Sequence, residues 1–290
     1  MSRQPSRLAT PAAKRLSLAD VSSKGSGLPN RYILHGVEKI GKTSFAAYAP
    51  SPIFIETRGE NGLETLIDAG RLPEIPHFPE VQTWSELLSC LDTLTKDEHK
   101  YRTVVIDTIN GAERLCHEEV CRRDFNNDWG EHGFTSYQKG YDVSLADWRQ
   151  MLSMLDTLRE TRKMSILCLC HTRVKTFRNP EGADYDRWSP DMNDKTWGLT
   201  HKWADAVVFV NFETFVDQKD PKRKGKASDN QQRIMFTERH AAYDAGNRFG
   251  LPTEILLGNN GQEAWNAFRN ALTEARKTTQ PAPAGEKASV

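Results

Sequence analysis

Short apolar runs alternate along the chain with longer amphipathic stretches. The apolar runs predict strands, at residues 31–35, 52–56, 103–107, 165–170, 206–212 and 232–237. Apolar residues spaced three and four apart predict helices, at residues 43–49, 84–95, 109–123, 141–162 and 263–276. Strands that alternate with helices build a mainly parallel sheet with helices packed against it, so the pattern predicts an α/β fold.

The alternation is continuous between two terminal segments of different composition. No linker-like stretch interrupts residues 31–277, which therefore predict one domain. Residues 1–30 carry five basic residues and one acidic residue among Ser, Ala, Pro and Gly, and they predict a disordered basic arm. Residues 278–290 are rich in Pro, Ala and Lys and predict a disordered tail.

Composition narrows the class of protein. The 39 Lys and Arg residues balance the 39 Asp and Glu residues, so any contact with nucleic acid must be local rather than spread over a basic surface. No run approaches the roughly 18–20 apolar residues that cross a bilayer, and the first residues contain no apolar signal core. Five widely spaced cysteines fit a reducing compartment. We therefore expect a cytoplasmic protein without membrane contact.

The segment between the first predicted strand and helix matches the phosphate-binding pattern G-x-x-x-x-G-K-[ST], also called Walker A. Its glycines allow backbone N–H groups to point inward at a phosphate. Lys42 is expected to bridge the β- and γ-phosphates of ATP, and Thr43 to place its hydroxyl on Mg²⁺. The residues expected to contact the nucleotide are Gly36, Val37, Glu38, Lys39, Ile40, Gly41, Lys42, Thr43 and Ser44.

Polar residues at the ends of three other predicted strands supply candidates for the rest of an active site. Asp107 ends the strand 103–107 and fits the Walker B carboxylate that holds the Mg²⁺ shell. Glu56 and Glu60 follow the second strand, and either could orient water toward the γ-phosphate. His171 follows the strand 165–170 and is a candidate sensor of the γ-phosphate, with a core histidine or a metal ligand as alternatives.

These segments together resemble the RecA-type ATPase core. The phosphate loop, the TVVID strand and the SILCLCHTRVK stretch carry the resemblance, which extends from about Arg31 to Phe268. The chain is similar to phage-encoded RecA-like P-loop ATPases of the AAA/RecA type, which include core-only single-strand-annealing proteins of bacteriophages. Further family-like stretches are Phe54–Thr57, Gly59–Leu63, Trp203–Ala206 and Ala242–Pro252. The resemblance implies a RecA-like P-loop NTPase core, a mainly parallel sheet flanked by helices.

The resemblance also implies roles for individual residues. RecA-like proteins usually carry the catalytic Glu in a D-T-E-G-like run after the second strand, and Arg58 stands at that place here. Glu60 restores a carboxylate after a short shift, and we prefer it to Glu56. His171 replaces the Gln or Asn that is usual at the sensor strand tip. The residues predicted to act in catalysis are Lys42, Glu60, Asp107 and His171.

Two loops line the channel for single-stranded DNA in RecA-like cores. By order along the chain, the corresponding segments here are about 122–141 and 172–203, and both interleave basic with aromatic residues. Both also contain many acidic residues, which weakens the signal, so ordinary structured loops with packed aromatic residues stay open as an alternative. The candidate DNA contacts in the second segment are Arg173, Lys175, Arg178 and Arg187.

The resulting prediction is an ATP-binding, Mg²⁺-dependent RecA-like ATPase that binds single-stranded DNA and assists annealing or strand pairing in phage recombination or replication. We expect a homo-oligomer in the host cytoplasm, with a single-strand-binding or replication protein as a further partner. Two alternatives stay open. One is a P-loop kinase of a small molecule or nucleotide, with residues 173–187 as its lid. The other is a non-catalytic, nucleotide-gated loader, which the arginine at position 58 motivates.

Overall fold

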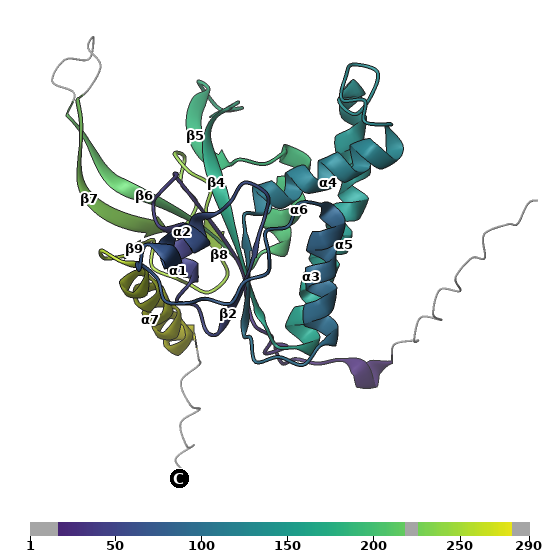
Figure 1. Cartoon of the computed structure of the whole chain (residues 1–290). Coiled ribbons are helices and arrows are strands. Elements are labelled where there is room, and N and C mark those ends of the chain that lie inside the picture. Colours follow the sequence, from purple (N-terminus) through teal and green to yellow (C-terminus); the bar gives the residue numbers. More distant parts are fainter. Residues whose placement is uncertain (1–16, 218–225, 280–290) are drawn as a thin grey trace, which may run out of the picture.

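The computed structural model describes residues 17–217 and 226–279. A sheet runs through the middle of the molecule, and helices lie on both of its faces (Figure 1). The strands are β1 (Arg31–Gly36), β2 (Pro52–Glu56), β3 (Thr103–Asp107), β4 (Ser165–Phe177), β5 (Tyr185–Pro190), β6 (Ala206–Asp217), β7 (Lys226–Phe236), β8 (Gly246–Asn247) and β9 (Glu254–Leu256). The helices are α1 (Lys42–Ala46), α2 (Gly62–Asp68), α3 (Trp84–Lys96), α4 (Ile109–Asp124), α5 (Lys139–Thr161), α6 (Asp194–Trp203) and α7 (Gly261–Thr279), with short 3₁₀ turns at Leu18–Asp20 and Ser136–Gln138.

The sheet has the strand order β2-β3-β4-β1-β6-β7-β9. Neighbouring strands from β2 to β6 are parallel, whereas β7 and β9 add to the edge in antiparallel pairs. The predicted α/β class, a mainly parallel sheet flanked by helices, is confirmed. Because the carboxyl ends of parallel strands meet at one edge, β1, β2, β3 and β4 deliver the residues that follow them to the same place.

The two faces of the sheet are buried against different helices. Side chains alternate along a strand, so the neighbours Ile33 and Leu34 of β1 enter opposite cores. The core that contains Ile33 is closed by α3, α4 and α5, and the core that contains Leu34 is closed by α1, α2 and α7. Burial on both faces explains why the central strands read as continuous apolar runs.

The segment 172–203 is not the loop that the resemblance implied. Strand β4 continues past His171 to Phe177 and turns back through β5 as an antiparallel hairpin, and α6 follows. Asn193 caps α6, since its side chain accepts a hydrogen bond from the Lys195 N–H. The hairpin strands consist mainly of half-buried and exposed residues and contain no continuous apolar run, so the apolar pattern of the sequence does not mark them as strands. The hairpin projects from the sheet in Figure 1.

The two predicted disordered termini remain predictions. Residues 1–16 and 280–290 lie outside the described part of the chain. Within the described ranges, none of the helices is both long and apolar enough to cross a membrane.

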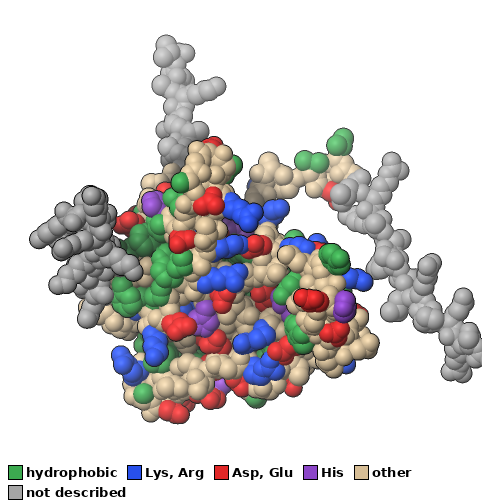
Figure 2. Space-filling model, turned by 90° about the horizontal axis from the view of Figure 1, so that it is seen from above, with side chains coloured by type: hydrophobic (Ala, Val, Ile, Leu, Met, Phe, Trp, Pro, Cys, Tyr) green, Lys and Arg blue, Asp and Glu red, His purple; other side chains and the backbone are tan. Residues whose placement is uncertain are grey.

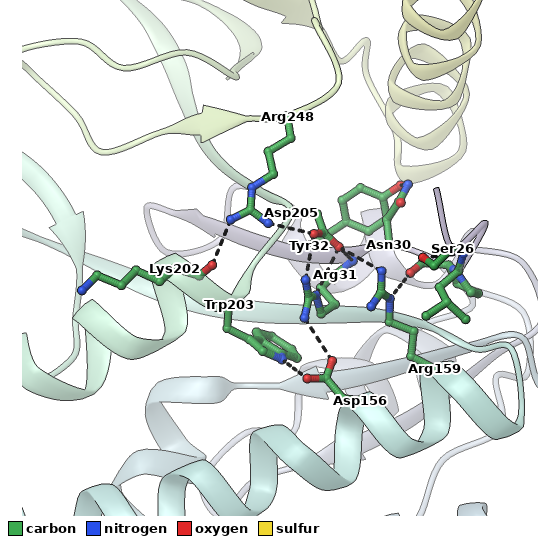
Figure 3. A network of polar contacts seen from close by, with 12 residues as sticks. Ser26, Asn30, Arg31, Tyr32, Asp156, Arg159, Lys202, Trp203, Asp205 and Arg248 are labelled. Atoms are coloured by element: carbon green, nitrogen blue, oxygen red, sulfur yellow. Dashed lines mark hydrogen bonds and ion pairs between the residues drawn. The ribbon is translucent and has the colours of Figure 1, made fainter. Parts of the chain in front are cut away.

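A network of charged residues connects the starts of β1 and β6 with α5, at the edge of the sheet opposite the phosphate loop (Figure 3). Asp205 accepts hydrogen bonds from the backbone N–H and the guanidinium of Arg31, at 2.9–3.2 Å. Arg248 binds the same carboxylate at 3.1 Å, and the Arg159 guanidinium lies 3.9 Å from it. Burial alone would raise the pKa of Asp205, but Arg31 outweighs that effect and holds the pKa below its ordinary value.

Asp205→Asn is expected to lower the free energy of unfolding at pH 7 by about 2 kcal/mol, because the half-buried Arg31 and Arg159 lose this counterion, although Arg31 keeps its ion pair with Asp156. A carboxylate whose pKa is lowered by folding stabilises the protein above its unfolded pKa, and this contribution is lost as the pH falls through the folded pKa. The deficit of the variant should therefore shrink only below about pH 4. Denaturant titrations at several pH values measure it. Glu160→Gln, an exposed charge change on α5, is the matched control and should stay within about 0.5 kcal/mol. An equal effect of both variants at pH 7 would contradict the stabilising role of Asp205.

Candidate active site

The phosphate loop joins the end of β1 to the start of α1. Two of its glycines are required by the geometry. At Gly36, an added Cβ would lie 2.5 Å from the backbone oxygen of Val210 on the adjacent β6. Gly41 has a φ of 100°, in the left-handed region that favours glycine, and its missing Cβ leaves room for the Arg233 guanidinium. Glu38 and Lys39 are exposed in the middle of the loop, and Ser44 is half-buried in α1.

Lys42 is buried and its ammonium group is directed into the loop. It donates hydrogen bonds to the carbonyl oxygens of Gly36 and Val37, both at 3.0 Å. Burial lowers the pKa of Lys42, while the nearby negative charges of Asp107 and Glu60 act in the opposite direction. Among the described residues, the hydrogen bonds of this cation are to backbone oxygens, which it can exchange for those of an anionic ligand.

Thr43 and Asp107 bring two oxygen ligands together. The Thr43 hydroxyl of α1 donates a hydrogen bond of 2.8 Å to Oδ2 of Asp107 at the end of β3. Asp107 is buried, and burial raises its pKa to about 6, with the negative charge of Glu60 acting in the same direction. A hydroxyl and a carboxylate at hydrogen-bond distance are ligands that Mg²⁺ prefers. The residues present therefore fit a Mg²⁺ site.

The Glu60 side chain extends from the turn after β2 to Thr108, which follows β3, and to His171 of β4. Its Oε1 is 2.9 Å from Nε2 of His171 and accepts a hydrogen bond of 3.3 Å from the Thr108 hydroxyl. Burial alone would raise the pKa of Glu60, but the bonds to His171 and Thr108 and the charge of Lys42 bring it below its ordinary value. His171 is itself positioned through its backbone N–H, which donates to the side-chain oxygen of Asn110 at 3.0 Å. At neutral pH Glu60 is therefore an ionised carboxylate.

Glu56 has a different environment from Glu60. It is the last residue of β2 and lies opposite Asp107 in the register of β2 and β3. Only 3% of its surface is exposed, its Oε1 accepts the Leu63 N–H at 3.2 Å, and burial raises its pKa to about 7. The Glu60 side chain is 23% exposed and ionised, so it is better placed to contact a water molecule. This difference supports the preference for Glu60 that the sequence analysis stated.

Arg58, which replaces the expected glutamate, directs its guanidinium to α4. Its guanidinium forms an ion pair with Glu118 on α4, and its backbone N–H donates to the carbonyl of Val81. The arginine therefore fixes the turn after β2 against α4. The carboxylate that reaches the site comes from two residues later in the same turn.

Three residues at the site were absent from the sequence prediction. Thr108 follows Asp107 and caps α4, and Asn110 is in the first turn of α4; this place beside a strand end is a signal that could have identified both. Arg233 of β7 donates hydrogen bonds to the carbonyl oxygens of Ile40 in the phosphate loop and of Gly258. No motif marks Arg233, because its position depends on the antiparallel addition of β7 to the sheet.

The four candidate DNA contacts are on the β4–β5 hairpin, but they do not form a basic patch. Arg173 pairs with Asp191, Lys175 with Asp194, and Arg187 with Asp244. Arg178 is exposed and has no ion-pair partner among the described residues. Figure 2, which views the edge at which the hairpin projects, shows basic and acidic side chains interspersed. DNA contact by these four residues remains a prediction.

Comparison with known proteins places this site in a family. No curated protein matches the chain. Among solved structures, the crystal structure of the RadB recombinase is similar at 12% sequence identity and a TM-score of 0.43, over 81% of this chain and 90% of that one. The model of the AAA domain family matches residues 28–249, a range that contains the phosphate loop, Glu60, Asp107 and His171. The chain belongs to the AAA domain family.

Proposed function

We propose that this protein is a RecA-like ATPase that binds ATP with Mg²⁺ at the phosphate loop and hydrolyses it. The observation that supports the proposal most strongly is the convergence of three chemically different groups. These are the cation Lys42, the metal-binding pair of Thr43 and Asp107, and the ionised carboxylate of Glu60. Phosphoryl transfer requires little covalent chemistry from a protein, so positioning and electrostatic stabilisation by such groups are sufficient for catalysis.

Each group has a distinct task in the proposed reaction. Lys42 exchanges its loop carbonyl partners for phosphate oxygens, and Thr43 and Asp107 hold Mg²⁺, which neutralises charge on the phosphates. Glu60 accepts a hydrogen bond from the attacking water and orients it. His171 holds the Glu60 carboxylate, with its Nε2 atom 2.9 Å from Oε1, and responds through this contact to a change at the γ-phosphate.

The raised pKa of Asp107 predicts a pH-dependent affinity for Mg²⁺·ATP. The metal must displace the proton that Asp107 binds below about pH 6, so affinity should fall by roughly tenfold per pH unit below that value. Calorimetric titrations between pH 5 and pH 8 measure this. The control is Asp107→Asn, which lacks the titrating carboxyl group. Its affinity as a function of pH shows the part that comes from protonation of ATP. A wild-type profile parallel to that of Asp107→Asn would contradict the metal assignment.

We further propose that ATP binding controls contact with single-stranded DNA during phage recombination or replication, a role that the resemblance to phage-encoded single-strand-annealing proteins suggests. The support is a direct connection in the chain, because the β4–β5 hairpin begins at the residue after His171. Ordering of His171 by a γ-phosphate is thus transmitted to a hairpin that carries basic and aromatic side chains. Assembly into a homo-oligomer and action with a single-strand-binding or replication protein belong to the same proposal.

Fluorescence anisotropy with a labelled single-stranded oligonucleotide tests the DNA proposal. We expect tighter binding with a non-hydrolysable ATP analogue than with ADP, and an affinity that falls with salt. Undetectable binding in both nucleotide states would reject it. Product analysis in separate reactions with Mg²⁺ and ATP distinguishes a hydrolase, which releases inorganic phosphate, from a kinase, which transfers phosphate to an acceptor.

A further inference from the structure

A second cavity lies between the β4–β5 hairpin and α6, and shares no residue with the phosphate loop. Its volume is about 160 Å³. Because side chains alternate along the hairpin, Phe177, Arg187 and Ser189 face the cavity from the same side of the two strands. Trp197 of α6 and Asp244, which precedes β8, line the rest of the cavity.

Among the described residues that line this cavity, Arg187 is the one whose buried side-chain nitrogens lack hydrogen-bond partners. Its side chain is 10% exposed, and among the described residues its Nε and one terminal nitrogen, Nη2, have no hydrogen-bond partner. The same Nη2 forms an ion pair with Oδ1 of Asp244 at 3.0 Å. This carboxylate neutralises the charge of the guanidinium, but the contact does not have the geometry of a hydrogen bond. The guanidinium lies over the ring of Phe177 at 5.6 Å, and Oδ2 of Asp244 accepts the Trp197 Nε1–H at 2.9 Å. Buried donors without partners are costly, so a site of this kind is completed by a ligand with matching acceptors.

The free donors define the ligand. Nε and Nη2 form one edge of the guanidinium, with two parallel N–H groups that match two acceptors in one plane. Carboxylates, phosphates and the O6 and N7 atoms of guanine have such acceptors. Asp244 and Asp194 place carboxylates at the cavity and disfavour an anion, although Lys175 pairs with Asp194.

The remaining lining favours a neutral planar ring. Trp197 supplies an aromatic surface of the kind on which bases stack, and Phe177 adds apolar lining beside the Arg187 guanidinium that lies over its ring. The volume is below the roughly 300–1,000 Å³ of sites for drug-sized ligands, so one base fits better than a whole nucleotide. Guanine is the base whose acceptors match the arginine edge.

We propose that this cavity binds one guanine base, with Nε and Nη2 of Arg187 donating to its N7 and O6 atoms. The identity of the occupant as a base of single-stranded DNA rests on the proposed function. Asp244 also links the cavity to the active site, since its backbone oxygen is 2.6 Å from Nε2 of His35, the residue before Gly36 of the phosphate loop. Binding of a base therefore acts on a segment that adjoins the nucleotide.

Two oligonucleotides of equal length, one of thymidine alone and one with guanines at intervals, test the proposal on the full chain. The phosphate loop is saturated with a non-hydrolysable ATP analogue so that free bases cannot occupy it. We expect at least about tenfold tighter binding of the guanine-containing strand. Replacing its guanines by 7-deazaguanine removes N7 and should abolish most of this preference in the unaltered protein. Equal affinity for all three strands would reject the cavity as a guanine site.

The variant Arg187→Lys keeps the charge but lacks the paired donors, so it should bind both strands with the same affinity. Arg269→Lys, the same change at an exposed position of α7, should keep the preference. Guanosine alone, followed through tryptophan fluorescence, separates the two proposals. Binding of guanosine without binding of any strand would support the cavity and reject the DNA function. Binding of all strands alike without binding of guanosine would support the DNA function and reject the cavity.

Discussion

Lys42→Ala is expected to abolish measurable ATP binding, with a loss of roughly 100-fold or more in affinity. The ammonium group is buried within the loop and donates to two backbone oxygens at 3.0 Å, where it would meet the phosphates. Two charge-assisted hydrogen bonds to phosphate are together worth about 3 kcal/mol or more, and every 1.4 kcal/mol is about tenfold in affinity. Thermal unfolding with and without Mg²⁺·ATP measures the loss, since saturating ligand stabilises the unaltered protein by about 2–4 kcal/mol.

The matched control is Lys100→Ala, which removes an exposed lysine before β3 and should keep the full ATP-induced shift. Melting of each variant without nucleotide shows whether the fold is intact. A Lys42→Ala variant that is folded and still stabilised by ATP as strongly as the unaltered protein would contradict the assignment of the phosphate loop.

Glu60→Gln is expected to retain ATP binding and to lose hydrolysis by about 100-fold to 10,000-fold, the range over which a positioned general base contributes. The amide keeps the size and the hydrogen bond with Thr108, but it lacks the negative charge that orients water. Steady-state release of inorganic phosphate, together with the ATP-induced thermal shift, measures the two effects separately. A fall in turnover without loss of the thermal shift is the signature of a residue that acts on the reaction rather than on binding.

Two glutamates provide the comparison for this variant. Glu64→Gln changes an exposed side chain of α2 and should leave turnover unchanged. Glu56→Gln affects a buried carboxyl whose pKa is raised to about 7, so we expect a smaller effect than at Glu60. Full activity of Glu60→Gln combined with an inactive Glu56→Gln would transfer the role to Glu56.

The sequence predicted the part of the site that local chemistry determines. The phosphate loop follows from the spacing of Gly36, Gly41 and Lys42 between an apolar strand and a helix, and the structure has this arrangement. Asp107 was predicted from its place at the end of a continuous apolar strand. The hydrogen bond from Thr43 to Asp107 then follows, because the carboxyl ends of parallel strands meet at one edge.

The remainder of the site depends on contacts between distant segments. The pairing of Glu60 with His171 joins residues 111 positions apart, and no local pattern indicates which of two glutamates takes part. The basic residues of the segment 172–203 were expected in a loop open to DNA. Instead, Arg173, Lys175 and Arg187 are paired with acids that the folding of the hairpin against α6 and Asp244 brings near. Tertiary packing, rather than composition, determines which of these charges are neutralised.

The hairpin is the structural link between the two sites inferred here. His171 contacts Glu60 on one side, and the next residue, Thr172, begins the pairing of β4 with β5. The buried side chain of His35, which precedes the phosphate loop, lies 3.3 Å from the Thr172 hydroxyl of β4 and 2.6 Å from the backbone oxygen of Asp244, which lines the second cavity.

The rate of ATP hydrolysis with Mg²⁺, measured with and without single-stranded DNA and with Lys42→Ala as the blank, tests the central claim most directly. We predict phosphate release that requires Lys42 and that single-stranded DNA accelerates. Release that requires Lys42 but is indifferent to DNA would contradict the DNA-dependent role and leave a simple NTPase. ATP binding without any phosphate release, in the presence or absence of DNA, would contradict the catalytic role of Glu60 and identify a nucleotide-gated binding protein.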